Sequence, residues 1–376
     1  MSPASYQTAP PRAALTIIAR TATATPQSWY EAPVRLGVES ALIDGRIVDG
    51  DVGIVDGRCA RFGLASANGR GIAVPGFVDL QVNGFAGVDF MEADRPGYRR
   101  AGEALLETGV IAYLPTFTTA SEEQLVAALG EIPDDSMGSR ILGAHLEGPF
   151  LSPLHLGAHP AAGRRDPDPD LLYRLLDSGP VRLVTLAPEL PGAHDLIRAL
   201  LQRGVTISFG HSDATAAEAN AGFDMGVRTV THLFNAMRPF HHRDPGIAGA
   251  VLAREDVIVQ IILDGVHLAP ETAGLVWRTA GARLALVTDF TTAPGGRTAD
   301  GVLAGSRGTM IEAVRNLHAL GASFEEAIRA ATEVPAHVLG ETSVGRLDVG
   351  LPADVVVLTD ELEIERVLVA GEDRLG

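Results

Sequence analysis

The chain has 376 residues, of which 46% are hydrophobic and 20% are charged. This length is enough for one large domain and a small one, and the composition is typical of a globular protein. Lysine and arginine together number 30 against 47 aspartates and glutamates, so the formal net charge is −17. That charge repels polyanions and no local basic patch is evident, so we expect neither a nucleic-acid partner nor an anionic membrane partner.

The single cysteine, Cys59, bears on the cellular compartment because it cannot form an internal disulfide. The first 33 residues carry no basic segment ahead of a long apolar run, and no stretch reaches about 18 apolar residues. We therefore expect a cytoplasmic protein that is neither secreted nor membrane-spanning.

The two ends of the chain differ from its middle. Residues 1–33 are rich in Ala, Thr and Pro without a sustained period, which predicts an N-terminal extension. Short alternating segments follow within residues 34–74, and a similar pattern returns within 341–376. The first set is punctuated by Asp-Gly pairs, which favour hairpin turns, at Asp44-Gly45, Asp49-Gly50 and Asp56-Gly57. We expect both ends to pair into one small β-sandwich-like domain.

Residues 75–340 show apolar, strand-like runs that alternate with helical stretches, a rhythm typical of parallel strands with crossover helices. The runs lie at 76–82, 110–116, 141–147, 181–187, 205–211, 228–234, 257–264 and 283–289. Helices are expected at 121–129, 193–203, 214–225, 270–279 and 324–339. Eight such units predict an α/β fold, a closed (β/α)₈ TIM barrel, with a doubly wound open sheet as the alternative.

Polar residues fall where these predicted strands end, which in a barrel is the face that carries active sites. Glu147, His211 and His232 end three of the strands. Two histidines and one carboxylate are a ligand set suited to zinc or a similar divalent ion. Each histidine could instead be a hydrogen-bonded structural residue, whereas a carboxylate buried at a strand end needs a partner.

Asp289 ends the eighth predicted strand. Its position suits a general base that takes a proton from metal-activated water and returns it to a leaving amine. The alternative is a carboxylate that caps the following loop.

Several motifs, in one order, carry a family resemblance. They are PGFVDLQVNG at 75–84, HLEGPF at 145–150, TLAPE at 185–189, GHSDAT at 210–215, THLFNAM at 231–237, DPGIAGA at 244–250, DGVH at 264–267 and LVTD at 286–289. With these motifs the chain resembles the amidohydrolase superfamily and, within it, the N-acetylglucosamine-6-phosphate deacetylases. The resemblance covers roughly residues 75–353.

The number of metal ions follows from two departures from other superfamily members. Many members carry His-x-His at the end of strand one, where this chain has Gln81-Val-Asn83. Others bridge two metals with a carbamylated lysine, and this chain has no lysine. The resemblance therefore implies one divalent ion, held by Glu147, His211 and His232. Zinc is the expected ion, although iron, manganese and cobalt accept the same ligands.

The resemblance also implies roles for residues that ligate no metal. Asp289 would be the catalytic acid and base, and His159 would orient or polarise the acetyl carbonyl. Asn235 and Ala236 would bind the phosphate, His267 would contact the sugar, and Arg243 would reach the phosphate bound by a neighbouring subunit. That last role implies a homodimer. Arg243 could instead belong to a solvated basic loop, since it follows two histidines.

The segment after Asp289 departs from the family pattern. Only residues 290–304 stand where the family carries roughly twenty more residues, and Phe290 replaces a small residue. The expected reaction is hydrolysis of N-acetylglucosamine 6-phosphate to glucosamine 6-phosphate and acetate, in amino-sugar catabolism. The alternatives are another N-acetyl sugar, such as N-acetylgalactosamine 6-phosphate, an unphosphorylated amide, or a non-catalytic protein that binds a sugar phosphate.

Overall fold

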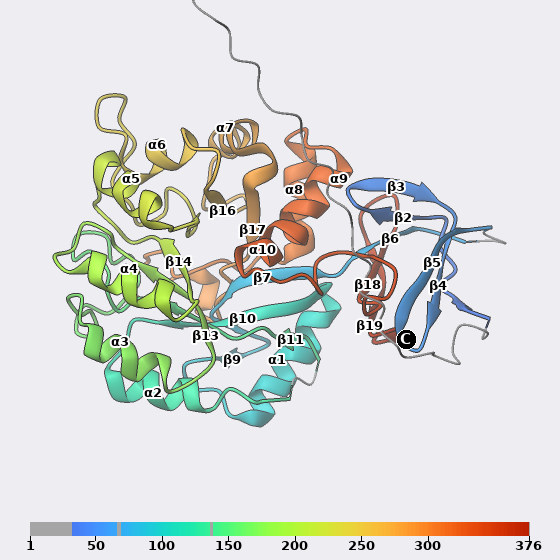
Figure 1. The fold of residues 1–376 in the computed structure, drawn as a ribbon, viewed down its shortest axis with the longest axis horizontal. Helices are drawn as coiled ribbons and strands as arrows, with labels where there is room; N and C mark the ends of the chain where they lie inside the picture. Colours follow the sequence, from blue (N-terminus) through green and yellow to red (C-terminus); the bar gives the residue numbers. More distant parts are fainter. Residues whose placement is uncertain (1–31, 66–68, 136–137, 376) are drawn as a thin grey trace, which may run out of the picture. The chain divides into compact units, whose positions relative to one another are not determined.

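The computed structural model describes residues 32–65, 69–135 and 138–375. Residues 1–31 of the predicted extension lie outside the described residues. Figure 1 shows strands ringed by helices and, from both ends of the chain, a second group made of strands.

The larger part is a barrel of parallel strands, in which each strand pairs with the next. In chain order the strands are β7 (Phe77–Val82), β10 (Val110–Thr118), β12 (Ala144–Glu147), β13 (Val181–Leu186), β14 (Thr206–Phe209), β15 (Thr229–Val230), β16 (Ile258–Ile262) and β17 (Leu284–Val287). A parallel bridge between Val82 and Phe290 closes the ring beyond the end of β17. The predicted (β/α)₈ barrel is confirmed, and the open sheet is wrong. A two-residue strand, β11 (Arg140–Ile141), also pairs with β10.

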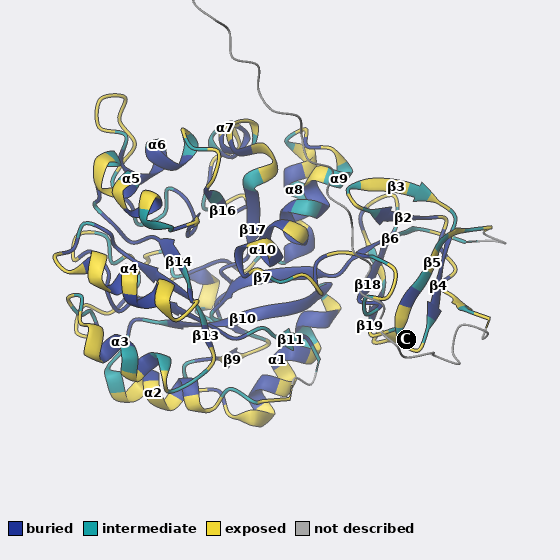
Figure 2. Ribbon diagram, viewed as in Figure 1, coloured by how far each residue is buried: buried dark blue, intermediate teal, exposed yellow. Residues whose placement is uncertain are grey.

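Helices surround these strands, with buried faces toward them and exposed faces outward (Figure 2). They are α1 (Arg95–Glu107), α2 (Glu122–Gly130), α3 (Pro169–Leu176), α4 (Ala193–Gln202), α5 (Ala216–Met225), α6 (Gly246–Leu252), α7 (Pro270–Ala280), α8 (Met310–Ala319), α9 (Phe324–Ala331) and α10 (Glu333–Val338). None of the described helices is long and apolar enough to cross a membrane.

One predicted helix, 324–339, is two helices that meet at Thr332, which has φ −132° and ψ −83°. Pro335 explains the break, because proline has no N–H for the carbonyl four residues earlier and its ring collides with that carbonyl.

Two sheets built from both ends of the chain form the smaller part. One has the order β1 (Val34–Arg35), β4 (Asp51–Val55), β5 (Arg58–Leu64). The other has the order β20 (Glu372–Asp373), β19 (Ile364–Val369), β18 (Val355–Leu358), β6 (Ile72–Pro75), β2 (Ser40–Ile43), β3 (Arg46–Asp49). The expected pairing of the chain ends is present where β18 runs antiparallel to β6.

Side chains alternate across the six-stranded sheet, as the two-residue period of a strand requires. Val355 and Val357 belong to the apolar cluster between the two small sheets. Val356 and Leu358, on the opposite face, belong to the large cluster that fills the barrel part. One sheet thus contributes to two cores and joins them.

The three Asp-Gly pairs do not all make hairpins. Asp44 and Asp56 have φ of +47° and +50°, and each begins the tight turn of a hairpin, β2–β3 and β4–β5 respectively. Asp49-Gly50 instead links β3 in one sheet to β4 in the other, so the hairpin expected there is wrong. A Cβ at Gly50 would lie 2.7 Å from the carbonyl carbon of Gly63, so this crossing depends on close backbone approach.

Candidate metal centre

The polar strand ends converge on one cavity of 530 Å³. The strands that deliver them are parallel, so their C-terminal ends meet at one mouth of the barrel. The lining side chains from these ends are Asn83, Glu147, His211, His232, Asn235, His267 and Asp289. The clustering expected from the barrel prediction is therefore present.

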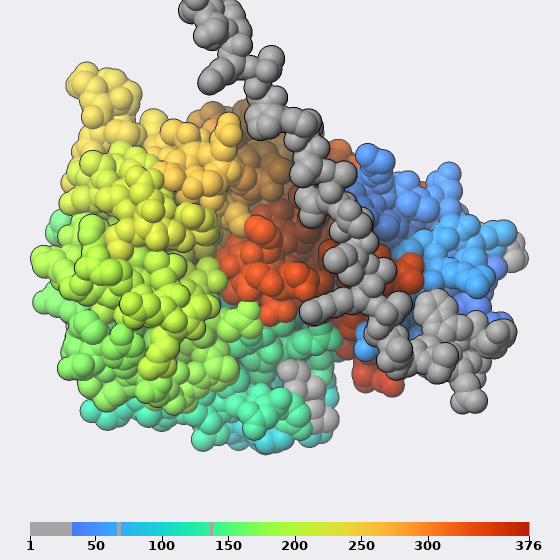
Figure 3. Space-filling model, viewed as in Figure 1, coloured from blue at the N-terminus to red at the C-terminus, as the bar shows by residue number. Residues whose placement is uncertain are grey.

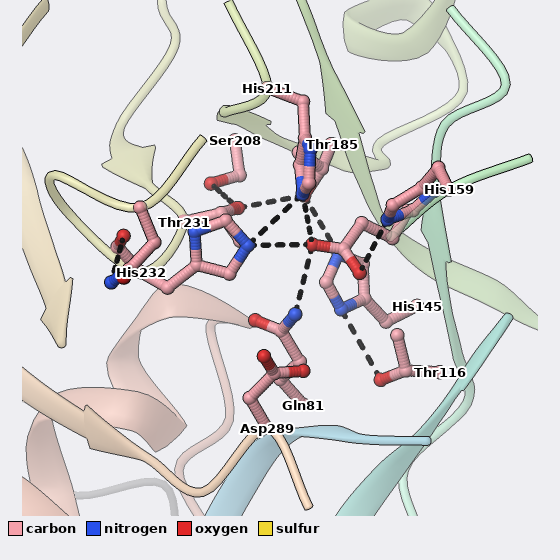
Figure 4. A network of polar contacts seen from close by, with 12 residues as sticks. Gln81, Thr116, His145, His159, Thr185, Ser208, His211, Thr231, His232 and Asp289 are labelled. Atoms are coloured by element: carbon pink, nitrogen blue, oxygen red, sulfur yellow. Dashed lines mark hydrogen bonds and ion pairs between the residues drawn. The ribbon is translucent and has the colours of Figure 1, made fainter. Parts of the chain in front are cut away.

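His211 and His232 point ring nitrogens toward each other (Figure 4), and both nitrogens contact Glu147. Oε1 of Glu147 lies 2.9 Å from Nε2 of His232 and 3.1 Å from Nε2 of His211, and the two nitrogens are 3.2 Å apart. All three residues are buried. They form a candidate metal-binding group.

The protonation of His211 bears on whether this group suits a cation. Its Nδ1 lies 3.0 Å from the backbone oxygen of His155, which can only accept a hydrogen bond. Nδ1 therefore carries a proton, and Nε2 can either hold a second proton and donate to Glu147 or present a lone pair to a cation. Zinc bonds of about 2.0–2.1 Å in tetrahedral geometry place ligand atoms about 3.3 Å apart, close to the observed separations. The residues fit a divalent ion.

Backbone strain marks the same positions. Left-handed φ values occur at His211 (+49°), His232 (+26°), Phe234 (+75°), Ala236 (+47°) and Asp289 (+49°). Each such residue costs about 1–3 kcal/mol and persists only where the surrounding structure enforces it, as at functional sites.

Glu147 is held as a carboxylate by its neighbours. Burial alone would raise its pKa, but hydrogen bonds from His159, His211 and His232 outweigh burial and place the pKa well below the ordinary value. Gln81 adds a 2.9 Å hydrogen bond from Nε2 to Oε1 of Glu147. Gln81, which stands where many superfamily members carry a histidine, thus orients the Glu147 carboxylate.

Asp289 is buried beside this group and accepts a 2.7 Å hydrogen bond from the side-chain amide of Asn83. Burial, reinforced by the charge of Glu147, raises the pKa of Asp289 to about 8. The strand end that carries Asp289 is fixed to β7 by Asp79, whose Oδ2 accepts a 2.6 Å hydrogen bond from the Thr288 hydroxyl.

His159 faces the carboxylate with a defined tautomer. Its Nδ1 accepts a 3.2 Å hydrogen bond from the backbone N–H of Thr119, so in the neutral ring the proton lies on Nε2. That Nε2 is 3.4 Å from Oε2 of Glu147. His159 therefore offers a hydrogen-bond donor at the cavity wall.

A buried layer of hydroxyls and one imidazole lies beneath the candidate ligands (Figure 4). Nε2 of His145 is 2.8 Å from the Thr185 hydroxyl, which is 2.7 Å from that of Thr231, itself 2.5 Å from that of Ser208. Burial lowers the pKa of His145 to about 4, which keeps it neutral. The quoted motifs contain His145, Thr185 and Thr231, but sequence alone gave no reason to connect them.

The expected substrate-binding residues divide into two groups. Asn235, Ala236 and His267 line the cavity. His267 is oriented by a 2.8 Å contact between its Nδ1 and Oδ2 of Asp264. The side-chain amide of Asn235 donates a 3.1 Å hydrogen bond to the backbone oxygen of His232. Arg243 does not line the cavity of its own chain.

Arg243 lies instead in the exposed loop between β15 and α6. This loop, yellow in Figures 1 and 3, protrudes from the surface. Its guanidinium contacts Nε2 of His242 at 2.9 Å. A contact from Arg243 to the phosphate bound by a neighbouring subunit stays a prediction.

Comparison with known proteins gives a consistent family. The sequence profile of the amidohydrolase family matches residues 72–373. A human relative named N-acetylglucosamine-6-phosphate deacetylase is 39% identical, with 87% of this chain and 89% of the relative covered. An Escherichia coli O157:H7 relative named N-acetylgalactosamine-6-phosphate deacetylase is 35% identical, with 79% and 86% covered.

The solved structures that resemble this chain include deacetylases of the same name. The N-acetyl-D-glucosamine-6-phosphate deacetylase of Mycobacterium smegmatis, solved as a mutant in complex with N-acetyl-D-glucosamine-6-phosphate, superposes with a TM-score of 0.86 at 32% identity. The superposition covers 92% of this chain and 100% of that one.

Proposed function

The chain belongs to the amidohydrolase family, and we propose that it hydrolyses N-acetylglucosamine 6-phosphate to glucosamine 6-phosphate and acetate, as a step of amino-sugar catabolism. The observation that carries this proposal is the buried Asp289 beside the Glu147, His211 and His232 group in one cavity. The names of the relatives and the ligand of the mycobacterial structure support the substrate.

Glu147, His211 and His232 would hold one divalent ion, for which we propose zinc. Two imidazole nitrogens and a carboxylate oxygen suit that ion and leave coordination positions for other ligands. A divalent ion at this place activates water and polarises a carbonyl oxygen.

Asp289 moves the protons in this proposal. One carboxylate oxygen takes a proton from the attacking water as the new C–O bond forms, and then gives it to the amide nitrogen as the C–N bond breaks. Burial keeps the pKa of Asp289 above its ordinary value, which favours the return of the proton. The bonded Asn83 amide holds the other oxygen in place.

His159 stabilises the negative charge that develops on the acetyl oxygen. Its Nε2 carries a proton because Nδ1 accepts from Thr119, so it can donate to that oxygen without a change of tautomer.

In this proposal, residues of two subunits recognise the phosphate. Asn235, through its side chain, and Ala236, through its backbone, would bind the phosphate, and His267 would contact the sugar. Arg243 of the partner subunit would reach the same phosphate, which requires a homodimer. The protruding, exposed loop that carries Arg243 suits such a role. We place the reaction in the cytoplasm, in agreement with the lone, buried cysteine.

A second candidate substrate is N-acetylgalactosamine 6-phosphate, because the E. coli relative carries that name. A non-catalytic role is less well supported, since Glu147, His211, His232 and Asp289 are all present and assembled.

The test is acetate release from N-acetylglucosamine and N-acetylgalactosamine, each with and without the 6-phosphate. We expect the highest kcat/KM for N-acetylglucosamine 6-phosphate. A higher value for the galactose epimer would favour the second candidate. Release from none of the four by metal-loaded protein would support a binding protein.

A further inference from the structure

The short segment after β17, residues 290–305, folds back over the cavity and is here called the strand-eight loop. The backbone N–H of Ser306 donates a 2.8 Å hydrogen bond to the backbone oxygen of Asp289. The N–H of Ala304 donates one of the same length to the backbone oxygen of Gly296. An antiparallel bridge joins Arg297 to Leu303. Cavity-lining residues of the loop are Thr291, Arg297, Thr298, Gly301, Val302, Leu303, Ala304 and Gly305.

A tilted aromatic pair lies at the base of this loop. The ring of Phe290 lies 4.5 Å from that of Phe85, and the guanidinium of Arg307 lies 5.1 Å from the Phe290 ring centroid. Phe290, which stands where the family has a small residue, is buried. Aromatic and cation–π contacts of this kind stabilise a fixed arrangement, so they help to hold the loop at the cavity.

Arg297 is the one arginine among the described residues that line this cavity, and the chain has no lysine. Its guanidinium donates one 2.7 Å hydrogen bond to the backbone oxygen of Gly301. Within the described residues it forms no ion pair with a carboxylate. An arginine has five N–H donors, so most of its donor capacity is free for a ligand.

The strand-eight loop also lies beside the loop that carries His267. A Cβ added at Gly308, just after the strand-eight loop, would lie 3.2 Å from the Cβ of Asp264, the residue that orients His267. Arg297 and His267 therefore face one cavity from adjacent loops of the barrel mouth.

We propose that Arg297 binds the phosphate group of the substrate from within the same chain and so helps to set the preference for phosphorylated sugars. This inference rests on the proposed function. A planar guanidinium matches a phosphate with two parallel hydrogen bonds. The other Asp, Glu, Lys or Arg side chains that line the cavity are the acids Asp89, Glu147 and Asp289, so Arg297 is the lining group that best matches an anionic phosphate.

This role is distinct from that of Arg243, which would act across a subunit interface. Each chain would supply one cation to its own substrate and one to its neighbour's. The shortened loop thereby gains a binding function.

The experiment compares kcat/KM for N-acetylglucosamine with and without the 6-phosphate in four proteins. These are the wild type, Arg297→Gln, Arg297→Lys and, as a matched loss of charge, Arg278→Gln on the exposed face of α7. Loss of a charge-assisted contact should reduce the preference for the phosphorylated sugar about 10- to 100-fold in Arg297→Gln, mainly through KM. Arg297→Lys should retain part of the preference, and Arg278→Gln should retain all of it.

Two results would overturn the inference. Equal losses for both sugars in Arg297→Gln would mean that Arg297 only shapes the loop through Gly301, while the phosphorylated substrate itself stands. No preference for the phosphate in the wild type would instead remove the proposed substrate, and the role of Arg297 with it.

Discussion

The side-chain amide of Asn83 donates a 2.7 Å hydrogen bond to Oδ1 of Asp289, across 206 residues of sequence. It joins the first strand of the barrel to the end of the eighth. Because the bond stabilises the charged carboxylate, it lowers the pKa of Asp289 against the effect of burial.

Replacing Asn83 with Ala should therefore raise the pKa of Asp289. The acid limb of the kcat/KM profile should move to higher pH by on the order of one unit, since a hydrogen bond to a charged group is worth about 1.5–3 kcal/mol. The measurement is a pH–rate profile, with Asn220→Ala on α5 as the control. An active Asn83→Ala protein with the wild-type profile would remove Asn83 from the proton-transfer machinery.

Asp289→Asn should lower kcat by about 10²- to 10⁴-fold, because an amide cannot accept and return the proton. Metal content should stay at the wild-type level, since the candidate ligands are other residues. Acetate release and elemental analysis on the same sample check both points. Either retained turnover or a lost metal ion would contradict the assigned role.

The homodimer can be tested by mixing two defective chains. Asp289→Asn has no base, and Arg243→Gln lacks the cation that would reach the neighbouring site. After unfolding and joint refolding in equal amounts, half of the dimers are mixed and each has one complete site, so about a quarter of wild-type activity should return. Activity no greater than the average of the two separate proteins would show that Arg243 does not act across an interface.

Stability of the metal-free protein should depend on pH through two buried carboxylates. Burial raises the pKa of Asp79 to about 6 and that of Asp289 to about 8, whereas both titrate near about 3.9 when unfolded. A raised folded pKa contributes stability that is complete below about pH 4 and is lost as the pH rises through the folded values.

Urea unfolding of metal-free protein should therefore give a lower midpoint at about pH 8.5 than at about pH 5. Asp289→Asn should flatten the part of this decline between about pH 6 and about pH 8. Equal slopes for wild type and variant over that range would mean that Asp289 titrates elsewhere.

The sequence was sufficient for the barrel because each strand is a run of apolar residues that ends at a polar one. It overestimated strand length where the site begins. Residues 228–234 were expected as one strand, yet β15 covers only Thr229–Val230. The chain leaves the sheet because His232 and Phe234 adopt left-handed backbone conformations, which local propensity does not encode.

The candidate ligands were predictable because their residue types and positions at strand ends indicate metal chemistry. The residues that hydrogen-bond to the site carboxylates could not be predicted in the same way. The donors to Glu147 and Asp289 are Gln81 and Asn83, which became visible only once β7 lay beside its distant partners. The place of Arg297 at the cavity depends on how the strand-eight loop folds, which the residues of that segment alone could not reveal.

The central claim is a single metal ion that acts together with Asp289, and a metal titration tests it most directly. Metal-stripped protein is titrated with zinc while acetate release from N-acetylglucosamine 6-phosphate is followed. We expect no turnover without metal and full activity at one ion per chain. Full turnover by the stripped protein, or a requirement for two ions per chain, would contradict it.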